Sequence, residues 1–337
     1  MSVFSTPYFY LLVIYDISKT IDGLSPLTKY YVRAFSLTTD GKVYYSSDVL
    51  YFITPNGSGT VDLNINGTAN CYIVRPAYAP YSFDATVKGN STESVGNPVE
   101  AVVLWESSLG TISSFERGDL IESVSYENGR VTFMLPFDVR PGNALIAVKD
   151  ASGKILWSWH IWVVDFDPVV TQQKYISGAI MMDRNLGALV IYDYDVRTYG
   201  LLYQWGRKDP FVNSHDGWNS AYTYPADLHK STQSQTYEYS ISHPTESLVG
   251  VDWNQEENLW SSHKTIYDPC PSGWRVPDIG VWDGIPSYSG DFGVHQGGGL
   301  LTRIRPPYSE PEACFYLGGC TGANLDHNDF HSSSYWH

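Results

Sequence analysis

The sequence is poor in charge, and above all in positive charge. Only 17% of its 337 residues are charged, whereas soluble domains typically have about 25%. Lys and Arg number 21 against 36 Asp and Glu, so the formal net charge is −15 at pH 7. Because no basic run occurs, the electrostatic footprint of a nucleic-acid-binding protein is missing, and so is that of a protein that docks on an anionic membrane. We therefore expect no nucleic-acid partner, and the acidity is read as a device for solubility.

Long apolar runs are missing as well. No stretch of 18 or more uncharged apolar residues occurs, so we expect no membrane span in this chain. The apolar start at residues 8–15 has no cationic region and no small-residue cleavage site, so no signal sequence is visible. Its Tyr and β-branched residues are more typical of a strand. We interpret the start as that of a mature secreted fragment, or of a chain that begins within a domain.

Cysteine is scarce and is not spaced for metal binding. The four cysteines, Cys71, Cys270, Cys314 and Cys320, form no CxxC pair, which argues against the usual zinc and thioredoxin patterns. Cys71 lies alone in a strand-like run, where we expect a buried free thiol. If the protein is exported, one disulfide among the other three is expected and one of them stays free. The pairing is left open.

Aromatic residues, by contrast, are abundant. They make up 15% of the chain, with 26 Tyr and 11 Trp, a composition typical of β-proteins and of extracellular binding surfaces. The hydrophobic content of 43% excludes wholesale disorder. The length predicts two or three domains.

Residues 1–55 predict the first β-module. Strand-length runs with period-two alternation are separated by turn signals, including Asp40-Gly41 between two such runs. The stretch from Gly23 to Ser36 resembles the last strands of a fibronectin type III domain. Leu24, Pro26 and Tyr30 match the corner that precedes its penultimate strand. Only half of such a module is present.

Residues 61–168 predict a β-sandwich. Their apolar runs are bounded by Asn128-Gly129, Pro141-Gly142 and Ser152-Gly153, which suits about seven short strands. The run LWSWHIWVVD, residues 156–165, is interpreted as a central strand buried on both faces, with His160 as a hydrogen-bonded core histidine. The alternative is an aromatic platform that stacks on sugar rings.

Three blocks dominate the last part of the chain: MMDRNLGAL at 181–189, GLLYQWGRKDPF at 200–211 and YDPCPSGWRVPD at 267–278. In this order they resemble the paralogous surface domain first described from Fibrobacter, which is abundant in Bacteroidetes outer-membrane and fimbrillin-like proteins. The run upstream, from about residue 68, is similar to the module that precedes this domain in Bacteroidetes surface lipoproteins. The resemblance implies an irregular α+β, C-type-lectin-like domain over 169–337, and an extracellular or outer-membrane location.

The blocks also supply candidate scaffold residues. Trp205 and Trp274 are apolar anchors, and Asp183 and Arg184 are expected to pair with Arg207 and Asp209 in a buried ion network. A polar ligand cleft is the alternative. The full set of expected structural residues is Asp183, Arg184, Trp205, Arg207, Asp209, Cys270, Trp274 and Arg275.

The ending departs from the family. Residues 332–336 only echo its usual Trp-Ser-Ser-Ser-type segment, and the closing strand with Val-Arg-Cys is missing, so the domain is expected to be incomplete. The resemblance gives Cys270 a partner in that strand, for which Cys314 or Cys320 are the substitutes in this chain.

No catalytic motif is found. The chain lacks GxSxG, HExxH, P-loop and GxGxxG contexts. Related formylglycine-generating enzymes use two cysteines and copper, but nothing beside Cys314 and Cys320 supports that chemistry. We expect no enzyme, no cofactor and no metal.

Candidate ligand-binding residues lie mostly in the polar tail. They are Trp218, Asp326, Asn328, Asp329, His331, Tyr335 and Trp336. The tail is read first as an exposed polar end, although Asn, Asp, His, Ser and Tyr also make adaptable binding surfaces. Such residues are typical of the variable proteins that retroelements diversify, an alternative that requires a neighbouring reverse transcriptase gene.

Together these features predict a mostly β, multidomain surface protein, in which sandwich modules precede the lectin-like domain. Its expected role is adhesion or ligand display, alone or in a fimbria-like assembly, with a protein or glycan as the ligand. The first alternative is a carbohydrate-binding module that stacks Trp162, Trp205 or Trp218 on glycan.

Overall fold

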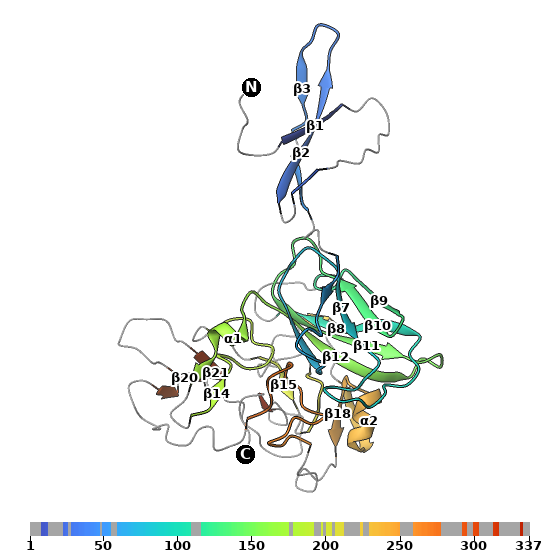
Figure 1. Ribbon diagram of the computed structural model, residues 1–337, viewed down its shortest axis with the longest axis vertical. Coiled ribbons are helices and arrows are strands. Elements are labelled where there is room, and N and C mark those ends of the chain that lie inside the picture. The colour runs from blue at the N-terminus through green and yellow to red at the C-terminus, as the bar shows by residue number, and fades with distance from the viewer. Residues whose placement is uncertain are drawn as a thin grey trace. The chain divides into compact units, whose positions relative to one another are not determined.

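The structure is a computed structural model of the chain. It describes residues 8–12, 23–25, 28–47, 49–54, 59–108, 116–174, 178–191, 197, 200–203, 206–211, 223–224, 229–249, 259–277, 292–294, 299–302, 313–316 and 331–332. Two compact units are found, one of residues 1–61 with 77–80, the other of residues 62–76 with 81–337. The described parts are mostly β, as predicted, and the helices are the short α1 (Pro168–Thr171) and α2 (Tyr237–Ser242) (Figure 1). Neither described helix has the length and apolar character needed to span a bilayer.

The first unit is a small mixed sheet. Its strands are β1 (Tyr8–Leu12), β2 (Lys29–Leu37), β3 (Val43–Tyr45) and β4 (Leu50–Ile53). Strand β2 pairs parallel with β1 and antiparallel with β3 and β4. The predicted turn at Asp40-Gly41 is confirmed, because it joins β2 to β3 with Gly41 at φ 82°. Tyr30 is buried and its hydroxyl accepts a hydrogen bond from the Ser25 N–H at 2.8 Å, the contact expected of a tyrosine corner.

The second unit begins with two facing sheets. The four-stranded sheet has the order β5 (Val61–Asp62), β7 (Tyr81–Asp84), β10 (Arg130–Met134), β9 (Ser123–Glu127). The five-stranded sheet has the order β16 (Thr223–Tyr224), β8 (Glu100–Ser107), β11 (Gly142–Lys149), β12 (Ile155–Val163), β6 (Cys71–Val74). The predicted turns at Asn128-Gly129 and Ser152-Gly153 are hairpin connections, which join β9 to β10 and β11 to β12.

Aromatic side chains hold the two sheets together. Phe83 of β7 stacks on Tyr72 of β6 at 4.8 Å between ring centroids and lies 5.0 Å from the ring of Trp159 on β12. Strand β12 lies between β11 and β6 and is buried from Trp157 onward, which confirms the predicted central strand. Trp162 is 0% exposed. The alternative of a sugar-stacking platform on this strand is therefore wrong for Trp162, because a buried ring offers no face to a ligand.

The remaining described strands are short and form small pairs. They are β13 (Gln173–Lys174) with β14 (Ile180–Met181), β15 (Leu202–Tyr203) with β22 (His331–Ser332), β17 (His229–Ser234) with β18 (Glu246–Val249), and β19 (Phe292–Val294), β20 (Gly299–Thr302) and β21 (Ala313–Tyr316) in one sheet. Where β15 pairs with β22, Tyr203 lies opposite His331.

Candidate functional site

The three sequence blocks pack on the face of the five-stranded sheet that points away from the sandwich interior. We call the described residues 181–189, 200–211 and 259–277 the outer layer. Its apolar side chains share one cluster with side chains of the sheet. The members of that cluster are Cys71, Trp105, Leu145, Trp162, Val164, Phe166, Met182, Leu186, Leu189, Leu201, Tyr203, Trp260, Cys270 and Val276. The blocks are therefore held in place by burial of their apolar residues against the sheet.

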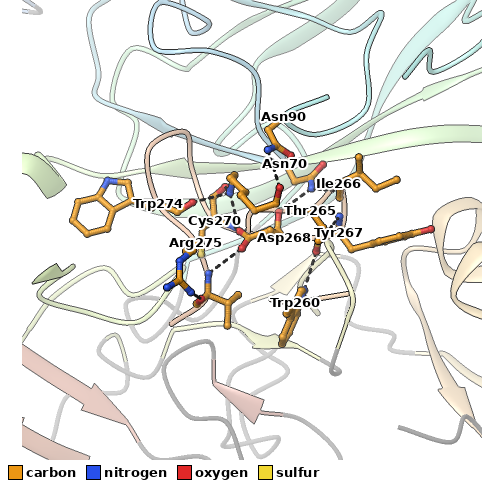
Figure 2. Close-up of polar contacts among 12 residues, drawn as sticks. Asn70, Asn90, Trp260, Thr265, Ile266, Tyr267, Asp268, Cys270, Trp274 and Arg275 are labelled. Carbon is orange, nitrogen blue, oxygen red and sulfur yellow. Dashed lines mark hydrogen bonds and ion pairs between the residues drawn. The ribbon is translucent and has the colours of Figure 1, made fainter. Parts of the chain in front are cut away.

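Asp268 organises the third block (Figure 2). Its buried carboxylate accepts hydrogen bonds from the backbone N–H groups of Cys270, at 2.8 Å, and Val276, at 2.9 Å. It also accepts from Lys264 Nζ at 2.7 Å. The same ammonium donates to the carbonyl oxygens of Cys270 and Trp274. One ion pair thus satisfies four backbone groups of an irregular loop, which a regular strand would satisfy by pairing.

Asn70 ties this loop to the sheet. It directly precedes β6, and its Nδ2 donates to the carbonyl oxygens of Ile266 at 2.7 Å and Asp268 at 2.9 Å. Its Oδ1 accepts from Trp157 Nε1 at 3.0 Å. Both polar side-chain atoms of Asn70 are hydrogen-bonded, so the position of the third block is fixed by directional bonds as well as by burial.

A second chain of hydrogen bonds joins the sheet to the first block. Asn143 on β11 donates from Nδ2 to the carbonyl oxygen of Gly187, at 2.9 Å. Its Oδ1 therefore accepts from His160 Nε2, also at 2.9 Å. That tautomer leaves His160 Nδ1 as an acceptor for the thiol of Cys71, whose Sγ lies 3.3 Å away.

Cys, His and Asn are also the residue types of a cysteine-hydrolase triad. Here the protonation states oppose that chemistry, which needs an accessible thiolate. Cys71 and His160 are both 0% exposed. Burial raises the pKa of the Cys71 thiol far above its usual range and lowers the pKa of His160 to about 3. Both groups are neutral at physiological pH, so the chain of bonds stabilises the core, and the prediction of a hydrogen-bonded core histidine is confirmed.

Lys208 and Asp209 form a buried ion pair against β12. Lys208 Nζ lies 2.7 Å from both carboxylate oxygens of Asp209 and donates to the backbone and hydroxyl oxygens of Ser158. It also lies 4.4 Å from the ring centroid of Trp157. Burial lowers the pKa of Lys208 to about 8, with the charge of Asp209 acting in the opposite direction.

Two arginines that are buried in the described part of the chain bind different segments. Arg207 lies over the ring of Phe211 and donates to the carbonyl oxygens of Pro244 and Glu246, at the end of α2 and the start of β18. Burial lowers its pKa to about 10. Arg184 makes two hydrogen bonds to its neighbour Asp183, at 2.8 and 2.7 Å.

These contacts correct one expectation. The sequence suggested that Asp183 and Arg184 pair with Arg207 and Asp209. Among the described residues, the ion pairs instead join sequence neighbours, Arg184 with Asp183 and Lys208 with Asp209.

The structure places only part of the predicted sites. Trp274 packs partly buried against the outer-layer cluster, Cys270 is a buried free thiol, and Arg275 donates to the Val276 carbonyl. His331 pairs through its backbone in β22. The remaining candidates lie outside the described residues: Trp205, Trp218, Asp326, Asn328, Asp329, Tyr335 and Trp336.

Sequence reasoning missed Asn70, Asn143, Lys208, Lys264 and Asp268. A sequence signal existed for Asp268. In an Asx-turn an Asp carboxylate accepts from the N–H of the residue two positions later, and an Asp in a loop rich in Pro is a candidate for such a turn. The two asparagines sit in or beside strands, where Asn is disfavoured unless it has a specific task.

Comparison with protein-family models, with curated proteins and with solved structures gave no significant match. Within the described part of the chain, no group of three or more His, Cys, Asp or Glu side chains is placed to hold a metal ion.

Proposed function

We propose that the chain is a non-enzymatic cell-surface protein for adhesion or ligand display, at the outer-membrane surface or outside the cell, as a single protein or within a fimbria-like assembly. The observation that supports this proposal is the use made of the outer-layer charges. Asp268, Lys264, Lys208, Asp209 and Arg207 are engaged by each other and by backbone groups. Charges that bond to each other and to backbone groups order the loops that carry them. A display protein requires such a frame of ordered loops.

In this proposal, residues 169–337 form a lectin-like domain of the kind that the three blocks resemble. The blocks act as its frame, and the binding residues lie outside them, at Trp218 and in the tail from Asp326 to Trp336. Val276, near the end of the third block, has its N–H fixed by Asp268, so the block is anchored close to its end.

A glycan is one ligand class within this proposal. Of the three tryptophans considered for sugar stacking, Trp162 is withdrawn because it is buried. Trp218 and, as the one candidate within a block, Trp205 remain, since an aromatic ring packs well on the apolar face of a sugar.

The test is a binding assay with purified protein on a glycan array and on a panel of immobilised matrix proteins. We expect saturable binding that is lost in Trp218→Ala or Trp336→Ala, with an unchanged thermal midpoint. Tyr44→Ala is the matched control, because Tyr44 is an exposed aromatic of β3 in the first unit. Absence of binding to both panels, or full binding by both tryptophan variants, contradicts the proposal.

A further inference from the structure

The second unit contains two buried free thiols in one apolar cluster. Cys71 lies in β6 and Cys270 lies in the third block, and both belong to the cluster between the sheet and the outer layer. An isolated parallel bridge pairs Cys71 with Pro271, the direct neighbour of Cys270. Paired strands lie about 4.8 Å apart, and disulfides join Cα atoms that are about 4.4–6.8 Å apart. The bridge places Cys270 next to the residue that pairs with Cys71, and both cysteines belong to the same apolar cluster, although they are far apart in sequence.

We propose that Cys71 and Cys270 form an intramolecular disulfide, of which the structure displays the reduced, dithiol form. Two S–H bonds break and one S–S bond forms. The two electrons and two protons pass to a disulfide oxidant, such as oxidised glutathione or a protein disulfide, which is reduced to two thiols. The proposed surface location enters this inference only as the source of that oxidant in the cell.

The local cost of the bond is small. Cys71 gives up its hydrogen bond to His160 Nδ1, and a thiol is a weak donor. His160 remains bonded to Asn143 through Nε2. On the Cys270 side of the proposed disulfide, Asp268 accepts from the Cys270 N–H and so holds the main chain of the third block in place.

Burial determines when the bond can form. Cys71 is 0% exposed and Cys270 is 6% exposed, so neither thiol meets an oxidant once the outer layer has docked. Burial also raises the pKa of both thiols, which removes the reactive thiolate. Oxidation therefore belongs to the folding chain, and the folded dithiol form resists it.

The experiment starts from reduced, unfolded protein. The chain with Cys314→Ser and Cys320→Ser, which keeps only the two cysteines in question, is refolded with and without oxidised glutathione. Proteolytic peptides are then mapped by mass spectrometry without reduction. We expect one cross-linked species that joins the peptides of Cys71 and Cys270, and a thermal midpoint higher by about 5–15 °C, because the bond closes a loop of about 200 residues. The folded dithiol chain is expected to react far more slowly with the same oxidant.

The unmodified chain is mapped in parallel, and it decides the matter if the serine variant does not fold. A disulfide from Cys270 to Cys314 or Cys320, or a Cys71 that stays a free thiol at every oxidant concentration, overturns the proposal. So does rapid oxidation of the folded dithiol form. Because the mapping uses purified protein and no ligand, its result is separate from the adhesion assay.

Discussion

The two faces of the five-stranded sheet are packed by different means. The inner face meets another sheet, and its contacts are apolar, as between Phe83 and Trp159. The outer face meets irregular loops, and its contacts combine the apolar cluster with buried polar side chains such as Asn70 and Asn143.

The difference follows from what each partner does with its backbone. The strands of a sheet satisfy their own N–H and C=O groups by pairing with each other. Packing one sheet on another therefore requires only apolar side chains between them. A loop leaves carbonyl and amide groups without partners, and burying them costs free energy unless side chains provide the missing bonds. Irregular structure can therefore be packed on a sheet only when side chains provide donors and acceptors, either from the loop itself, as Lys264 and Asp268 do, or from the sheet, as Asn143 does.

The largest effect is expected from breaking the buried ion pair on the outer face. Asp209→Ala leaves the Lys208 ammonium buried without its counterion, which should lower the free energy of unfolding by about 3–5 kcal/mol. Urea unfolding of the variant and the unmodified chain measures this loss of free energy. The double change Lys208→Met with Asp209→Leu removes both charges and should regain most of the loss. A single-variant loss below about 1 kcal/mol would show that the pair is not buried as described.

The next prediction compares the same new side chain on the two faces. Asn70→Leu removes bonds to Ile266, Asp268 and Trp157 and should cost about 2–4 kcal/mol. Ile161→Leu in β12, which is buried but outside the outer-layer cluster, should cost about 1 kcal/mol, because the volume is kept. Equal losses in urea unfolding would remove the proposed distinction between the faces.

The outer face should also make stability depend on pH. His160 has a folded-state pKa of about 3 against the usual 6.5, so its stabilising contribution is present above pH 6.5 and is lost as the pH falls toward 3. At pH 5 the loss should be about 2 kcal/mol. In His160→Gln the free energy of unfolding should change less between pH 7 and pH 5. The buried Glu106, whose pKa is raised, is common to both chains and cancels in the comparison. Parallel pH curves for the two chains would contradict this assignment.

The smallest effect concerns a hydroxyl on the outer face that lacks a bond. Tyr203 OH is buried with no hydrogen-bond partner among the described residues. Tyr203→Phe should leave the free energy of unfolding unchanged or raise it by up to about 1 kcal/mol. Tyr81→Phe is the matched control, because its hydroxyl donates to the Arg75 carbonyl at 2.8 Å, and its loss should cost about 1 kcal/mol. A clear loss in Tyr203→Phe would reveal a partner for this hydroxyl.

The inner face was largely predictable from the sequence. The hairpin at Asn128-Gly129 and the central strand at 155–163 both follow from local patterns. These features depend on neighbours in sequence or on the period of a strand, which a single sequence displays directly.

The outer face was not predictable in the same way. Asn70 reaches a carbonyl 198 residues away and Asn143 one 44 residues away. Backbone carbonyls are the same at every position, so no residue type marks the partner. The pairing of Arg184 with Asp183 was missed for the opposite reason, since the correct partner was adjacent and a distant one was considered first.

The bond between Asn70 and Asp268 also has a consequence in time. Strand β12 ends at Val163, 105 residues before Asp268 (268 − 163), and at about 5–20 residues per second the synthesis of these residues takes roughly 5–20 s. During that interval β6 and its neighbours exist, but the loop that completes their hydrogen bonds and covers Trp162 does not. The outer face is therefore open to other nascent chains while the ribosome is still working, and the rate of translation limits how long misassembly can compete with folding.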